Sequence, residues 1–109
     1  MNDIKSLAQE IAAFCDNRDW RKFHNGKDLA IALSVEASEL LETFLWKKPE
    51  DVSDLKIREE LADVIIYSLR MAEVYGFNVK EIVLDKLEKN KAKYPIEKCK
   101  GISKKYTEL

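Results

Sequence analysis

The chain has 109 residues, of which 46% are hydrophobic and 36% are charged. This length suffices for one domain, and the composition excludes both intrinsic disorder and a membrane-spanning chain. With only 3 glycines and 2 prolines, few tight turns are available, which argues against a β-sandwich or barrel and favours long helices. The net charge of −1 excludes a protein that binds polyanions through its overall charge.

The charges are nevertheless unevenly distributed along the chain. Residues 86–105 contain eight lysines and two glutamates, which leaves the remainder of the chain acidic. These lysines are either solvated charges of a helix surface or ligands for an anionic substrate. Arginine and aromatic residues do not alternate in this segment, so we expect no nucleic-acid partner.

The two cysteines and the N-terminal residues indicate the cellular compartment in which we expect the protein. Cys15 and Cys99 belong to no metal-ligand motif and indicate reduced thiols of an intracellular protein, with a single disulfide as the alternative. The first residues lack the features of a signal peptide, and no segment is long enough to cross a bilayer. We expect a cytoplasmic protein that does not bind membranes.

The first two helices are separated by an aromatic segment. Apolar residues at intervals of three and four predict a helix over residues 3–16. We expect an ordered loop next, because Trp20 and Phe23 would not be stable in solvent. A second helix is predicted from Asp28, as its N-cap, to Trp46. It is apolar over much of its circumference and is expected to be the most buried helix. Pro49 lies in the break that follows it.

Two further helices complete the expected fold. The third is predicted over residues 53–75, with Gly76 as a left-handed C-terminal cap. Asn78 and Glu81 form a variant capping box that begins a fourth helix, which ends near Lys93. Residues 96–109 form a tail without a clear period. Four helices with short connections indicate an all-α, four-helix bundle in a single domain of residues 1–109.

Two pairs of acidic residues interrupt the apolar faces of the second and third helices. At about 100° per residue, Glu36 and Glu39 fall among leucines and alanines, and Glu60 and Asp63 fall within a core stripe. Such a pair is ordinarily a solvated face or part of surface salt bridges, and Lys56, one turn before Glu60, could supply a partner. The duplication favours another explanation, because burying an unpaired carboxylate costs several kcal/mol.

Four carboxylates converging from two antiparallel helices are most simply explained by a divalent metal ion. Oxygen ligands without His or Cys favour Mg²⁺, Mn²⁺ or Ca²⁺ and disfavour Zn²⁺. A di-iron bundle would need Glu-x-x-His motifs, and the only histidine, His24, lies outside both helices. Mg²⁺ often takes its remaining ligands from substrate phosphates, so the pattern indicates phosphate chemistry. We expect Mg²⁺, with Mn²⁺ as a possible substitute.

Several motifs carry a family resemblance. Residues 36–39 (Glu-Ala-Ser-Glu) and 60–63 (Glu-Leu-Ala-Asp) are similar to the paired motifs of the MazG-like, all-α nucleoside triphosphate pyrophosphohydrolases. Further segments resemble the dCTP pyrophosphatase-like branch of that family, at residues 19–24, 44–46, 63–67, 90–95 and 104–109. One departure is that Val35 and Ser38 stand where branch members often carry glycine, although the ligand positions are intact.

The resemblance implies a reaction and roles for the acids. A nucleoside triphosphate, dCTP or a modified pyrimidine analogue, would be hydrolysed between its α and β phosphates to the monophosphate and pyrophosphate, in nucleotide-pool cleaning. Glu36, Glu39, Glu60 and Asp63 would hold Mg²⁺. Glu36 or Glu39 could act as the catalytic base that accepts the proton of the attacking water.

The substrate-binding residues each have an ordinary alternative. By resemblance, Trp20, His24 and Trp46 hold the base; alternatively, Trp20 pins a loop and His24 is a surface or capping residue. Tyr67, beside Asp63 on the wheel, could bond a phosphate or sugar oxygen or could simply be buried. The triphosphate could also meet residues of the fourth helix, namely Asn90 and Lys93.

The resemblance implies an assembly as well as a reaction. Family members are dimers or tetramers, and a second helix that is apolar nearly all round needs a partner or enclosure. We therefore expect a homodimer or homotetramer. One alternative is the same fold acting on dUTP or another nucleotide. The other is a non-catalytic helical interaction module whose acids bind a basic partner.

Overall fold

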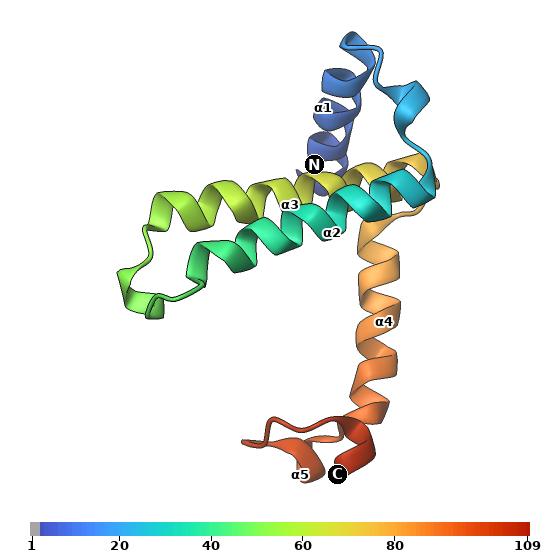
Figure 1. The fold of residues 1–109 in the computed structure, drawn as a ribbon. Helices are drawn as coiled ribbons and strands as arrows, with labels where there is room; N and C mark the ends of the chain where they lie inside the picture. Colours follow the sequence, from blue (N-terminus) through green and yellow to red (C-terminus); the bar gives the residue numbers. More distant parts are fainter. Residues whose placement is uncertain (1–2) are drawn as a thin grey trace. The chain divides into compact units, whose positions relative to one another are not determined.

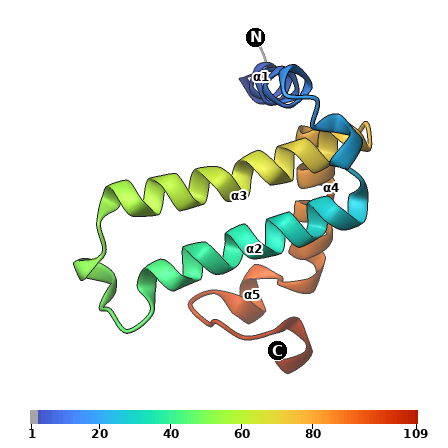
Figure 2. The same cartoon turned by 45° about the horizontal axis from the view of Figure 1, so that its top comes forward.

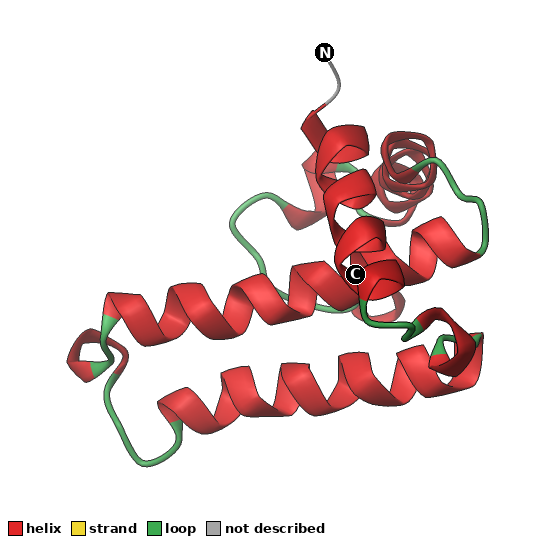
Figure 3. Ribbon diagram, turned by 90° about the horizontal axis from the view of Figure 1, so that it is seen from above, coloured by secondary structure: helices red, strands yellow, loops and turns green. Residues whose placement is uncertain are grey.

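The computed structural model describes residues 3–109, and this part of the chain is helical without strands (Figure 3). The helices are α1 (Asp3–Asn17), α2 (Gly26–Phe44), α3 (Asp54–Val74), α4 (Val79–Lys93) and α5 (Ile96–Cys99). Short 3-10 helices are η1 (Arg21–Phe23), η2 (Pro49–Asp51) and η3 (Tyr106–Glu108). The prediction of an all-α chain is confirmed. Among the described residues, no helix is both long and apolar enough to span a bilayer.

The chain forms two compact units, Met1–Phe77 and Asn78–Leu109. In the first unit, α2 and α3 run antiparallel and side by side, joined by the connection that contains η2 (Figure 1). Helix α1 lies against α3 (Figure 2). The second unit contains α4, α5 and η3. A single domain of residues 1–109 stays a prediction.

The N-cap of helix α2 lies three residues earlier than the sequence predicts, and the helix ends two residues earlier. The N-cap is Asn25 rather than Asp28: the Asn25 side chain accepts a hydrogen bond from the Asp28 backbone N–H and donates one to the Asp28 carboxylate, both at 2.8 Å. Both residues are good caps, and periodicity alone does not choose between them. The helix ends at Phe44 because the backbone of Leu45 is extended, and Trp46 then has the left-handed φ of +64°.

The predicted boundaries of α3 and α4 are confirmed. Gly76 has a φ of +70°, and the following Phe77 N–H reaches back to the Ala72 carbonyl at 2.8 Å, which closes the end of α3. Asn78 caps α4 by accepting a hydrogen bond from the Glu81 N–H at 3.0 Å. The tail, for which no period was visible, contains α5, whose four residues are too few to establish one.

Helix α2 is not the most buried helix, so that prediction is wrong. Ile31, Val35 and Leu41 of α2 are at least half exposed, and only Leu29 and Thr43 of this helix are buried. The small apolar core of the first unit instead draws on α1, α2, α3 and Val52, and consists of Ile11, Cys15, Leu29, Val52, Leu69 and Ala72. Much of the wide apolar surface of α2 therefore has no cover within the first unit.

Candidate metal centre and active site

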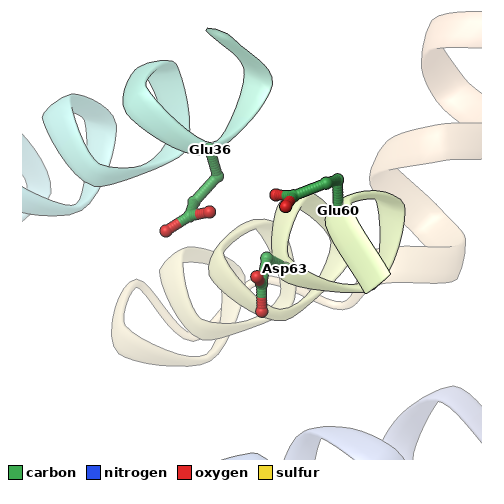
Figure 4. Close-up of side chains that lie close together, drawn as sticks. All are labelled: Glu36, Glu60 and Asp63. Atoms are coloured by element: carbon green, nitrogen blue, oxygen red, sulfur yellow. The ribbon is translucent and has the colours of Figure 1, made fainter. Parts of the chain in front are cut away.

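Three of the four predicted carboxylates come together between α2 and α3. One oxygen from each of Glu36, Glu60 and Asp63 lies within 4.8 Å of the other two. Figure 4 shows Glu36 of α2 directed toward the two acids of α3. Oxygen ligands bind divalent ions at about 2.0–2.6 Å, so ligands on opposite sides of one ion are about 4–5 Å apart. The three oxygens fit around a single ion.

The burial of this cluster supports the same interpretation. Glu60 is only 8% exposed. Its Oε2 and the Oε2 of Glu36 are buried without a hydrogen-bond partner among the residues that the structure describes. A buried acceptor without a partner is destabilising, and a charged one more so. A divalent cation would satisfy both oxygens, and carboxylates are the ligand type that Mg²⁺, Mn²⁺ and Ca²⁺ prefer.

Glu36 is the carboxyl whose proton affinity is most altered. Burial raises its pKa to about 7, with further contributions from a hydrogen bond with Glu39 and from the charges of Glu39, Asp63 and Glu60. A carboxyl that titrates near neutral pH can accept or release a proton under physiological conditions. Because a bound divalent cation would favour the carboxylate form, this raised pKa of Glu36 belongs to the metal-free protein.

Glu39 lies beside the cluster of three rather than within it. Glu39 contributes to the raised pKa of Glu36, which shows that it lies next to the cluster. It also faces a cavity of about 610 Å³, a volume typical of ligand pockets, whose lining residues are Glu39, Glu42, Thr43, Lys47, Val52, Ser53, Lys56 and Glu60. The carboxylates thus adjoin a cavity into which a ligand could enter.

A lysine compensates part of the negative charge. The Lys56 Nζ lies 2.9 Å from Oε1 of Glu60, which is the intrahelical pair that the sequence allows. Because Lys56 is more than half exposed and Glu60 is nearly buried, the lysine reaches the acid from the solvent side. It satisfies one oxygen of Glu60 and leaves the other without a partner.

Tyr67 lies one turn beyond Asp63, close to the acids. Burial raises the pKa of the Tyr67 hydroxyl, and the charges of Glu36 and Asp63 raise it further. The hydroxyl therefore stays protonated and can donate a hydrogen bond to an anionic oxygen.

The three residues predicted to hold the base do not come together in one chain. Trp20 and His24 precede α2, whereas Trp46 follows it. Since α2 has 19 residues, it is about 28 Å long at about 1.5 Å per residue. Trp20 packs edge-on against Phe14, with ring centroids 5.6 Å apart, while Trp46 is 99% exposed.

Asn90 and Lys93 belong to α4, in the second unit. Lys93 places its Nζ 4.9 Å from the ring centroid of Tyr106, in a cation–π contact. The backbone carbonyl of Asn90 accepts a hydrogen bond from the Tyr94 N–H at 2.8 Å. Their part in substrate binding stays a prediction.

Sequence reasoning missed Arg70, which the structure places in contact with His24. The Arg70 Nε donates a hydrogen bond to Nδ1 of His24 at 2.8 Å, and the arginine is 1% exposed. A signal was available, because Arg70 follows Asp63 by seven residues and so lies on the same face of α3. Its partner, 46 residues away along the chain, could not be found by helical spacing.

Comparisons with known proteins identify relatives of this chain and of its helical fold. The family model of the MazG-like family matches residues 31–109. Human dCTP pyrophosphatase 1 is 37% identical over 117 aligned positions, which cover the whole chain and 67% of the human protein. The Bos taurus protein of the same name is 34% identical, with 68% of its length covered. The crystal structure of a pyrophosphatase from Archaeoglobus fulgidus superimposes with a TM-score of 0.80 at 37% identity, covering 87% of this chain and 94% of that one.

The helical fold, the carboxylate cluster and these matches together define the class of protein, a hydrolase of the nucleoside triphosphate pyrophosphatase type. The chain belongs to the MazG-like family, in its dCTP pyrophosphatase-like branch.

Proposed function

We propose that this chain is a Mg²⁺-dependent, cytoplasmic pyrophosphatase that converts dCTP or a modified pyrimidine analogue to the monophosphate and pyrophosphate in nucleotide-pool cleaning. The observation that carries the proposal is the cluster of Glu36, Glu60 and Asp63, in which two buried carboxylate oxygens have no partner among the described residues. The relatives named dCTP pyrophosphatase 1 support the choice of substrate. We propose a free nucleotide rather than a nucleic acid as the substrate, because the cavity beside the site is lined largely by acidic and neutral residues.

Glu36, Glu39, Glu60 and Asp63 would hold the ion and organise the reaction. When bound, Mg²⁺ would neutralise the negative charge that develops on the phosphate oxygens during hydrolysis. Glu36 or Glu39 accepts the proton of the attacking water.

The cavity beside Glu60 is the proposed entry of the triphosphate. Lys47 and Lys56 line it together with the acids, and both can donate to phosphate oxygens. Tyr67 can donate a hydrogen bond to a phosphate or sugar oxygen. From the family resemblance, we also propose Asn90 and Lys93 of α4 as substrate-binding residues.

A base pocket that uses Trp20, His24 and Trp46 requires more than one copy of the chain. Glu36 follows His24 by twelve residues and precedes Trp46 by ten, so the tryptophans flank the carboxylates from opposite directions. We propose a homodimer or homotetramer in which Trp46 and the segment of Trp20 come from different copies.

Exposed apolar surface supports that assembly. Both units have large apolar side chains that are at least 43% exposed. In the first unit these are Ile31, Val35 and Leu41 of α2 and Leu61 and Ile65 of α3, and in the second unit they are Ile82, Val83, Leu84 and Leu87 of α4. Covering such surface is the main driving force for association. The proposed assembled form is a four-helix bundle within a homo-oligomer.

The direct test follows the products by ³¹P NMR. A panel of triphosphates that includes dCTP, dUTP and modified pyrimidines is incubated with Mg²⁺, with Mn²⁺ and with a chelator. We expect pyrophosphate and the monophosphate, fastest with dCTP or an analogue, and no turnover with chelator. Glu60→Gln and Glu39→Gln should lower kcat/KM by about a hundredfold or more, whereas the exposed neighbour Glu59→Gln should not.

Each alternative predicts a different result of this panel. Faster hydrolysis of dUTP or another triphosphate would replace the proposed substrate while retaining the reaction. Absence of hydrolysis with every triphosphate and metal would contradict the enzyme and favour the helical interaction module. Near-normal rates in both Glu39→Gln and Glu60→Gln would remove these residues from the proposed site.

A further inference from the structure

Arg70 is a buried cation that contacts a residue of the proposed base pocket. Its Nε donates to Nδ1 of His24 at 2.8 Å, and its Nη1 donates to Oε2 of Glu73 at 2.9 Å. Its Nη2 is buried and has no hydrogen-bond partner among the described residues. With only 1% of its surface exposed, Arg70 can change neither its position nor its partners without disturbing the end of α3.

The direction of the hydrogen bond determines the state of the imidazole. Every nitrogen of an arginine side chain is a donor, and the guanidinium does not lose its proton in proteins. Nδ1 of His24 must therefore be the acceptor and cannot carry a hydrogen. The neutral ring then has its hydrogen on Nε2, which makes that nitrogen a hydrogen-bond donor.

The surroundings also disfavour the imidazolium form. Protonation of Nδ1 would place a second positive charge against the guanidinium of Arg70 and would break the 2.8 Å hydrogen bond. Burial and the charge of Arg70 both lower the pKa of His24. Glu73, one turn further along α3, pairs with Arg70 at 2.9 Å.

We propose that Arg70 is a positioning residue that fixes His24 as a neutral ring with an Nε2–H donor, and that this donor recognises a hydrogen-bond acceptor on the nucleotide base. The identity of the ligand rests on the proposed function, whereas the state of the ring does not. A fixed donor matches a carbonyl oxygen or an unprotonated ring nitrogen of a pyrimidine. It rejects a group that can only donate, because two donors would then face each other.

The chain is well suited to a test, because His24 is its only histidine. Long-range ¹H–¹⁵N correlation spectra of labelled protein distinguish the two neutral tautomers and the imidazolium. We expect the wild-type ring to be neutral at pH 7, with its hydrogen on Nε2 and a pKa below the usual value. A hydrogen on Nδ1 in the wild type would overturn the proposal without the need for any variant.

Variants separate positioning from folding. In Arg70→Met, which keeps an unbranched side chain, we expect a mixture of tautomers, a higher His24 pKa and an increase in KM of about tenfold with little change in kcat. Arg70→Lys keeps the charge but lacks Nε, so it should not restore the tautomer. Glu73→Gln removes the other partner of Arg70 and should leave the tautomer unchanged.

The readouts distinguish this proposal from the proposed function. An unchanged tautomer in a folded Arg70→Met protein would overturn the positioning role, whatever the enzyme hydrolyses. A wild-type Nε2–H tautomer in a chain that hydrolyses no triphosphate would retain the role of Arg70 and contradict only the nucleotide as its ligand. A shift of the Nε2 signal on adding a non-hydrolysable dCTP analogue is expected, and its absence would contradict the contact with the base.

Discussion

Glu36 of α2 and Glu60 of α3 face each other, and each has one buried carboxylate oxygen without a hydrogen-bond partner among the described residues (Figure 4). Like charges at this separation oppose each other, and burial strengthens the opposition. The metal-free protein is therefore destabilised at its own candidate site. A cation that binds only the folded chain would stabilise it by mass action.

Glu36→Gln should remove a pH dependence from the stability of the metal-free protein. The pKa of Glu36 is raised from 4.5 to about 7 in the folded chain. Between these values the folded chain retains a proton that the unfolded chain has released, so the contribution of Glu36 to stability declines as the pH rises through 7. From about pH 5 to about pH 8, the urea midpoint of the wild type should fall relative to that of the variant, in the presence of a chelator.

Comparing the wild type with Glu36→Gln separates the effect of Glu36 on stability from that of His24. His24 has a lowered pKa, so the folded chain releases its proton first and stability rises with pH through this transition. Because both proteins contain His24, its effect cancels in the difference. Parallel pH profiles would contradict the prediction, and added Mg²⁺ should stabilise the wild type more at the higher pH than at the lower one.

Much of the fold could be predicted because its signals are local. A cap such as Asn78, a left-handed glycine such as Gly76 and apolar residues at helical spacing each act within a few residues of the chain. The start of α2 was misplaced because Asn25 and Asp28 are both good caps. The burial of α2 was misjudged because an apolar surface on a helix does not reveal what covers it.

The same distinction applies to the candidate site. Helical spacing alone places Glu60 beside Asp63, and the antiparallel pairing of α2 with α3 then brings Glu36 to them. The contact between Arg70 and His24 joins residues 46 positions apart, and neither residue carries a local signal of the other. Likewise, the length of α2 separates Trp46 from Trp20. Motifs in the sequence do not reveal this separation, because it depends on the folded helix.

Lys56→Gln should strengthen binding of divalent metal. Lys56 is 2.9 Å from Glu60 and competes electrostatically with any cation at the cluster. Because the lysine is largely exposed, the effect should be modest, about two- to fivefold in the affinity for Mg²⁺ measured by isothermal titration calorimetry. Lys27→Gln, an exposed change at the start of α2, is the matched control. Weaker metal binding by Lys56→Gln would show that the lysine supports the site.

Gly26→Ala should destabilise the protein although alanine is the better helix former. A Cβ at position 26 would overlap the ring end of Tyr75, which stacks on Phe77 with centroids 5.5 Å apart. Displacing Tyr75 should outweigh the helix gain of up to about 1 kcal/mol and lower the free energy of unfolding by about 1 kcal/mol. In a Tyr75→Ala background the same change should be neutral or stabilising. An equal loss in both backgrounds, measured by urea unfolding, would contradict this role of Tyr75.

Mixing two variants with weakened substrate binding should restore activity at low substrate concentration if the base pocket uses two copies of the chain. Trp20→Ala and Trp46→Gly should each raise KM by about tenfold or more, because stacking on a base is worth about 1–3 kcal/mol. Glycine is chosen at position 46 because the backbone there has a φ of +64°, which glycine adopts without strain.

In a mixed dimer, one pocket receives both substitutions and the other receives neither. Co-refolding equal amounts of the two variants makes half of the dimers mixed, so about a quarter of the pockets should be intact. The rate at low dCTP should rise to about that fraction of the wild-type rate, and urea unfolding of each variant checks that it folds. If the rate of the mixture is only the average of the rates of the two variants, Trp20 and Trp46 of different copies do not bind the same base. The pocket would then use a single end of α2, either Trp46 or the segment that contains Trp20 and His24.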